Sequence, residues 1–139
     1  MQKLKQIPPG EVPKPKKAPP GELPVIEQTR DLILWYVPLL NRLPRAHRYT
    51  LGERIITSLY ELLEELIRAR YAKQKRAQLE ASNLRLELLR QQARLLVSFK
   101  LIDGGQFQHV SKLINTVGIS IGSWLKQQTA VTTAPDFVA

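Results

Sequence analysis

Cysteine is absent from the 139 residues of this chain. Its absence excludes disulfide bonds, thiolate chemistry and cysteine-based zinc sites, and it is compatible with a cytoplasmic protein. The first ten residues lack the apolar core of a signal peptide. The apolar stretch between Lys112 and Lys126 is too short to span a bilayer. We therefore expect a cytoplasmic location and no membrane partner.

Residues suited to catalysis or metal binding are also scarce. The only histidines, His47 and His109, lie in different predicted elements, and neither has a carboxylate at the spacing of a di-iron ligand set. The pair Gly104-Gly105 lacks the Lys-Ser/Thr that completes a phosphate-binding loop. No nucleophile is spaced from a base in a catalytic pattern. The sequence therefore predicts a protein that is not an enzyme and that binds no metal or cofactor.

One group of glutamates could be taken for a carboxylate cluster, and it consists of Glu61, Glu64 and Glu65. These residues fall between the apolar positions of a predicted helix. Glu64 also precedes Arg68 by four residues, the spacing at which opposite charges pair on a helix surface. We interpret the group as a solvated helix face and not as a metal site.

Acidic residues are few, since 21 lysines and arginines stand against 12 aspartates and glutamates, which gives a net charge of +9. Residues 1–24 hold five lysines and two glutamates, or +3. Residues 25–128 hold 16 basic and nine acidic residues, or +7, and Asp136 contributes −1. The excess positive charge thus extends into the predicted folded part. It favours an anionic partner, with nucleic acid preferred over a membrane surface.

The basic residues concentrate around residues 66–79, which contain no acid. Further arginines follow on the next predicted helix. Phosphate contacts of this kind give affinity without reading sequence. An ordinary charged surface is the alternative, although such a surface normally mixes in acids. The predicted nucleic-acid-binding residues are Arg68, Arg70, Lys73, Lys75, Arg76, Arg85, Arg90 and Arg94.

Hydrophobic periodicity predicts an all-α domain over residues 25–128, an antiparallel up-and-down four-helix bundle. We expect helices at residues 25–43 and 50–72, the second opened by a capping box of Thr50 and Glu53. A break near 72–80, or at 81–83, separates the third helix, and Asp103-Gly104-Gly105 supplies a left-handed cap before the helix at 106–127. Residues 1–24 carry seven of the ten prolines and form a disordered basic arm, either a solubilising tail or a binding arm. Residues 129–139 form a flexible tail.

Two features predict close packing. Gly118 and Gly122 lie four residues apart in the last helix, and each costs up to about 1 kcal/mol against alanine there. We interpret them, with Trp124 beside them, as a groove for a neighbouring helix; two tolerated surface glycines are the alternative. The third helix carries two apolar lines, and a small core needs only one, so the surplus indicates an oligomer interface. The lines are Leu84, Leu88, Leu95, Phe99 and Ile102, and Leu86, Leu89 and Leu96.

Several segments resemble the accessory variability determinant (Avd) family of diversity-generating retroelements, which belongs to a wider group of four-helix bundles that includes proteins encoded in ribosomal-RNA intervening sequences. The segment with Gly118, Gly122 and Trp124 carries the most specific similarity. Together the similar segments span residues 25–127. They are residues 36–39, 43–47, 49–55, 88–90, 93–95 and 118–125.

The resemblance implies a barrel-shaped homopentamer that binds the retroelement's reverse transcriptase and template RNA and supports error-prone cDNA synthesis without being the catalyst. The repeated Pro-Pro-Gly-Glu arm is not part of the family pattern. The alternative is a structural oligomeric bundle of the ribosomal-RNA intervening-sequence type, which has no polymerase partner. The positive charge favours the first function.

Overall fold

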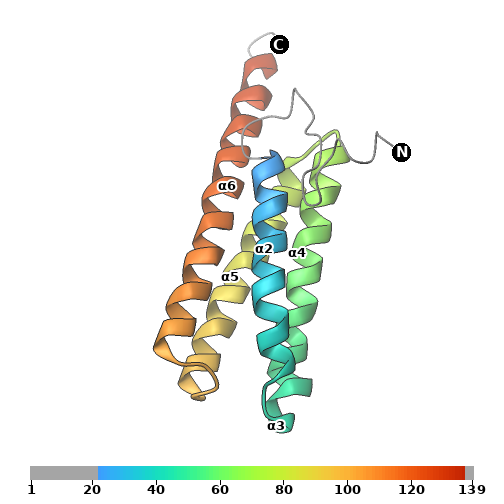
Figure 1. The fold of residues 1–139 in the computed structure, drawn as a ribbon. Helices are drawn as coiled ribbons and strands as arrows, with labels where there is room; N and C mark the ends of the chain where they lie inside the picture. The colour runs from blue at the N-terminus through green and yellow to red at the C-terminus, as the bar shows by residue number, and fades with distance from the viewer. Residues whose placement is uncertain (1–21, 137–139) are drawn as a thin grey trace, which may run out of the picture.

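Residues 22–136 are described in a computed structural model of the chain, with side chains described for residues 24–128. These residues form four long helices: α2 (Glu22–Asn41), α4 (Glu53–Tyr71), α5 (Arg76–Ser98) and α6 (Gly104–Asp136). The helices run alternately up and down, and each packs against two others in the cyclic order α2, α4, α5, α6 (Figure 1). The predicted four-helix bundle is confirmed. Nearly all of the predicted arm lies outside the described residues.

The core is built from one apolar stripe on each helix, as the periodicity predicts. Tyr36 and Trp124 are its largest members, and both are fully buried. Two buried hydroxyls are satisfied within their own helices, because Thr29 donates to the Val25 carbonyl and Ser82 to the Gln78 carbonyl. A hydrogen bond of 2.7 Å from Ser120 to Gln28 joins α6 to α2.

The connection between α2 and α4 is helical, and the predicted loop at residues 44–49 is wrong. A short helix α3 (Arg45–His47) leads into a π-helix, η1 (Arg48–Gly52). Pro44 starts this segment, and its carbonyl accepts from the amides of His47 and Arg48 at 2.8 and 2.9 Å. The predicted capping box is also wrong. The Thr50 hydroxyl instead bonds back to the Ala46 carbonyl at 3.2 Å, inside a continuous helical path.

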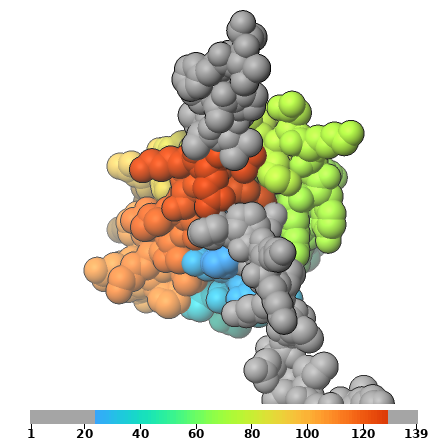
Figure 2. Space-filling view, turned by 90° about the horizontal axis from the view of Figure 1, so that it is seen from above, coloured from blue at the N-terminus to red at the C-terminus, as the bar shows by residue number. Residues whose placement is uncertain are grey.

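The break between the second and third helices falls at residues 72–75, which confirms the first predicted position and excludes the one at 81–83. Ala72 is extended, with φ −81° and ψ 146°, and ends α4. Figure 2 views this end of the bundle, where α6 and α4 lie on opposite sides and α2 begins.

In the connection between α5 and α6, the residues that end α5 and begin α6 differ from those that the sequence pattern predicted. The left-handed residue is Lys100, at φ 61°, and not a glycine. Leu101 donates to the Leu96 carbonyl and Lys100 to the Val97 carbonyl, the two bonds of a Schellman motif. Asp103 and Gln106 then form a capping box, with reciprocal bonds of 2.7 and 2.9 Å.

Helix α6 is longer than predicted. It starts at Gly104 and continues to Asp136, beyond the predicted end at residue 127, so the helix includes most of the segment predicted as a flexible tail. Its last turns extend past the ends of the other helices (Figure 1).

Candidate nucleic-acid interface

Two arginines of the predicted basic cluster at the end of α4 are paired with carboxylates. Arg68 pairs with Glu65 at 3.6 Å and with Glu64 at 4.0 Å. Arg76 pairs with Glu80 at 3.2 Å. The acids lie just outside the acid-free window, and helical spacing brings them back onto the arginines. These three glutamates therefore reduce the positive field that the linear sequence predicted.

The arginines of α5 are also engaged. Arg85 forms an ion pair with Glu61 across the seam between α5 and α4. Arg90 pairs with Glu87 at 3.1 Å. Hydrogen bonds from Gln91 and Arg90 lower the pKa of the Glu87 carboxyl below its ordinary value. The glutamates of α4, predicted as a solvated face, thus serve as ion-pair partners for arginines.

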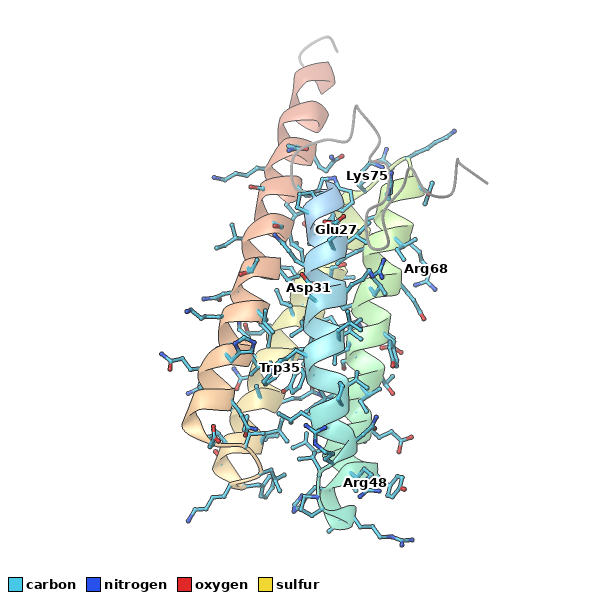
Figure 3. All side chains as sticks on the ribbon, in the orientation of Figure 1. Glu27, Asp31, Trp35, Arg48, Arg68 and Lys75 are labelled. Atoms are coloured by element: carbon cyan, nitrogen blue, oxygen red, sulfur yellow. The ribbon has the colours of Figure 1, made fainter. Side chains whose placement is uncertain are left out.

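Lys75 has a structural position that sequence reasoning missed. Its ammonium group donates to the carbonyls of Ala69, Arg70 and Ala72 at 2.9, 2.9 and 3.0 Å. These carbonyls end α4, where the helix dipole favours a positive charge. Lys75 therefore caps α4 and makes the tight turn into α5 possible without glycine or proline; Figure 3 shows it at this end of the bundle.

Besides Lys75, three residues of the predicted set form no ion pair within residues 24–128, namely Arg70, Lys73 and Arg94. Lys73 and Arg94 are exposed, and the Arg70 guanidinium lies 5.9 Å from the centre of the Tyr71 ring. These three cations remain available for phosphate groups.

Arg90 and Arg94 line an open groove between α5 and α6, with a volume of about 570 Å³. Phe107 and Ser111 line it from the α6 side. Arg90 and Arg94 therefore lie on the same face of α5. Two residues that line the groove, Ser98 and Phe107, flank the α5–α6 turn. The groove therefore extends toward that turn and away from the α4–α5 turn.

The two glycines of α6 differ. A Cβ added at Gly118 would lie 2.8 Å from Arg90 Nη2 and 3.2 Å from Leu86 Cδ2, so α5 packs closely there. A Cβ at Gly122 would meet nothing within 4 Å. The groove for a neighbouring helix stays a prediction, because the neighbours described at Gly118 are side-chain atoms of α5 and none is described at Gly122. Trp124 is fully buried, in agreement with its predicted packing position.

The outer side of α5 is apolar and uncovered. Leu84, Leu88, Leu95 and Phe99 are all exposed, whereas the other predicted line, Leu86, Leu89 and Leu96, is buried in the core. Ile102, predicted on the outer line, is buried as well. The surplus of apolar residues that the sequence indicated is therefore present on the surface.

A second basic surface, which sequence reasoning missed, lies at the opposite end of the bundle from Lys75; Figure 3 places Arg48 there. Tyr49 and Phe99 are 60% and 55% exposed, and the His47 and Phe99 rings lie 5.2 Å apart. The cations of this end are Arg42, Arg45, Arg48 and Lys100, and none of them forms an ion pair within residues 24–128. The alternation of arginine and aromatic residues in 45–49 is a signal that could have identified it.

Metal and membrane sites were also sought among the described residues. No group of three or more histidine, aspartate or glutamate side chains in this part of the chain could hold a metal ion. None of the helices described combines the length and the hydropathy needed to cross a bilayer.

The sequence matches the model of a family described as bAvd-like, over residues 24–128. The match covers the whole of the bundle for which side chains are described, and it confirms the resemblance found in the motifs. A search of curated proteins gives no match.

Proposed function

Because the chain belongs to the bAvd-like family, we propose that it is a non-catalytic accessory protein of a diversity-generating retroelement, acting in the cytoplasm. In this role it binds the reverse transcriptase and the template RNA of the same element and supports mutagenic cDNA synthesis. The family match over residues 24–128 carries the proposal. The charge of +7 on residues 25–128 supports an RNA partner.

Within this function, Arg70, Lys73 and Arg94 supply phosphate contacts, because no carboxylate in the described bundle neutralises them. The arginines that pair with glutamates contribute a weaker positive potential at the surface. They are Arg68, Arg76, Arg85 and Arg90. Lys75 contributes charge, but its donors are already occupied. The RNA contacts are thus distributed over the surface, which suits binding that does not read sequence.

Changing Arg70, Lys73 and Arg94 together to glutamine is expected to weaken RNA binding and to lower the cDNA yield of the reverse transcriptase. The slope of log affinity against log salt should become shallower by roughly 2, at about 0.7 per lost single-strand contact. RNA affinity across a salt series and a cDNA assay with purified polymerase, with and without the protein, measure both effects.

The matched control changes Arg68 and Arg76, which have acidic partners, to glutamine, and the expected change in slope is smaller. If the parent protein binds RNA but cDNA synthesis is the same with and without it, the polymerase role is wrong. That result would favour a structural bundle of the ribosomal-RNA intervening-sequence type.

We also propose that the protein assembles as a homopentameric barrel through the leucines of the uncovered face of α5, Leu84, Leu88 and Leu95, with Phe99 at the end of the helix left exposed. Leu84→Glu with Leu88→Glu places charge on this face and should reduce the solution mass from five chains of 15.9 kDa toward one. Light scattering measures the mass. The matched control is Leu34→Glu on α2, where the leucine is 67% exposed and away from α5. A parent protein that is monomeric at micromolar concentration would exclude the barrel.

A further inference from the structure

The end of the bundle formed by α3, η1 and the α5–α6 turn combines exposed rings with cations that have no carboxylate partner. Arg48 lies over the Tyr49 ring, with its guanidinium carbon 5.6 Å from the ring centre. The His47 ring packs against Phe99, which links α3 to the α5–α6 turn. Rings and cations from three segments of the chain thus lie on one surface.

The backbone at this surface is unusual. A π-helix is rare, and it frequently marks a functional site. Here its position depends on Gly52, because a Cβ at that residue would lie 3.2 Å from the His47 carbonyl oxygen and 3.3 Å from the Leu43 side chain. The close packing of Gly52 holds η1 against the end of α2. Tyr49, within η1, is directed to solvent, with 60% of its surface exposed.

The net charge at the end of the bundle that contains η1 is positive even when the hydrogen bonds and nearby acids of its residues are counted. Arg48 donates to the Leu43 carbonyl, and no carboxylate pairs with it among residues 24–128. The acids in the flanking turns are Glu53 and Asp103, and the Asp103 carboxylate already accepts from the Gln106 amide. With Arg54, which follows Glu53, five cations against two acids leave an excess of three positive charges.

At the α4–α5 end, three of the five cations are engaged, whereas Arg70 and Lys73 form no ion pair within residues 24–128. Arg68 and Arg76 have acidic partners, and Lys75 caps α4. Tyr71, 78% exposed beside Arg70, is an exposed ring of comparable chemistry there. The two ends therefore form a natural comparison: both have free cations, but the end with η1 has two exposed rings, Tyr49 and Phe99, and the α4–α5 turn has one, Tyr71.

We propose that single-stranded RNA binds at the end of the bundle that contains η1, and that its unpaired bases stack on Tyr49 and Phe99. Arg42, Arg45 and Lys100 then contact the phosphates on either side of these bases. Stacking on aromatic rings is tolerant of sequence, and it selects single strands because paired bases present no free face. This proposal rests on the proposed function for its RNA partner and adds the form of RNA that is bound.

The test compares binding of labelled oligouridine and of duplex RNA to the full chain by fluorescence anisotropy. Tyr49→Leu with Phe99→Leu should weaken oligouridine binding at least about five-fold, since stacking on each ring carries that much or more. Duplex affinity and the salt slope should change little, because no charge is removed. The matched control, Tyr60→Leu with Tyr71→Leu, should weaken oligouridine binding much less, because it keeps the charge of Arg70 beside Tyr71.

A second variant tests the cations without altering the rings. Arg42, Arg45 and Lys100 changed together to glutamine should make the salt slope shallower by roughly 2. Circular dichroism checks that each variant is folded, and light scattering checks its mass.

Three results would overturn the proposal. The first is unchanged oligouridine affinity in the folded Tyr49→Leu/Phe99→Leu variant. The second is an equal loss of affinity in the Tyr60→Leu/Tyr71→Leu control. The third is a change in the solution mass of the Tyr49→Leu/Phe99→Leu variant, which would assign the two rings to contacts between copies of the chain. In each case the parent protein still binds RNA with a steep salt dependence, and the proposed function stands. A parent that binds no RNA would contradict both proposals.

Discussion

Tyr36→Ala is expected to lower the free energy of unfolding by about 3–5 kcal/mol, the range for truncating a large buried aromatic residue. Tyr36 is fully buried in the core between the helices. Tyr36→Phe should leave stability unchanged or raise it, because the phenol oxygen is buried without a hydrogen-bond partner and its removal relieves that cost. Urea unfolding at one protein concentration measures both variants.

The same residue predicts a response to alkaline pH. Burial raises the pKa of the Tyr36 phenol above its ordinary value. The unfolded chain therefore loses this proton first, at a pH of about 10, and stability falls as the pH rises further. The fall should be smaller in Tyr36→Phe. A Tyr36→Phe variant that loses several kcal/mol would show that the hydroxyl has a partner after all.

Lys75→Met is expected to cost about 1.5–3 kcal/mol, the range for hydrogen bonds to a charged group. The substitution removes three bonds to the last carbonyls of α4 and keeps a side chain of similar length. Thermal unfolding measures the loss. The control is Lys73→Met, which removes the same charge two residues away at an exposed position and should change stability little.

The Lys75 result also separates two roles. If Lys75→Met and Lys73→Met were equally stable, the hydrogen bonds of Lys75 to the end of α4 would not stabilise the fold. Lys75 would then act only as a surface cation. If only Lys75→Met is destabilised, any loss of RNA binding in that variant has to be compared at equal folded fraction. Lys75 is therefore unsuited to a charge-removal test.

Most of the fold follows from the sequence because each long helix carries an apolar stripe at helical spacing. The stripe of α2 illustrates this, since Thr29, Tyr36 and Leu40 are all buried. The ends of helices were harder to predict. Thr50 and Glu53 have the spacing of a capping box, yet Pro44 starts the helical segment earlier, and the α6 box uses an Asp-Gln pair instead.

The candidate site was predicted less well, for two physical reasons. Linear windows omit the acids one helical turn away, and Glu80 returns to Arg76 in this way, whereas the Glu64–Arg68 pair was predicted from its spacing and is confirmed. The antiparallel bundle predicted from the sequence places its first and third connections at one end, but the contact of His47 with Phe99 there depends on tertiary packing that one sequence does not give. The basic surface at the end of the bundle that contains η1 was therefore not predicted from the sequence.

The cyclic order of the helices determines how the bundle closes. Three of its four seams join helices that follow each other in the chain, so short connections bring them together. The seam between α2 and α6 joins the first helix to the last, and its Ser120–Gln28 hydrogen bond spans 92 residues. The entropy of closing that long loop delays the contact until the other seams exist. We therefore expect the α2–α6 seam to form last during folding and to open first in the native state.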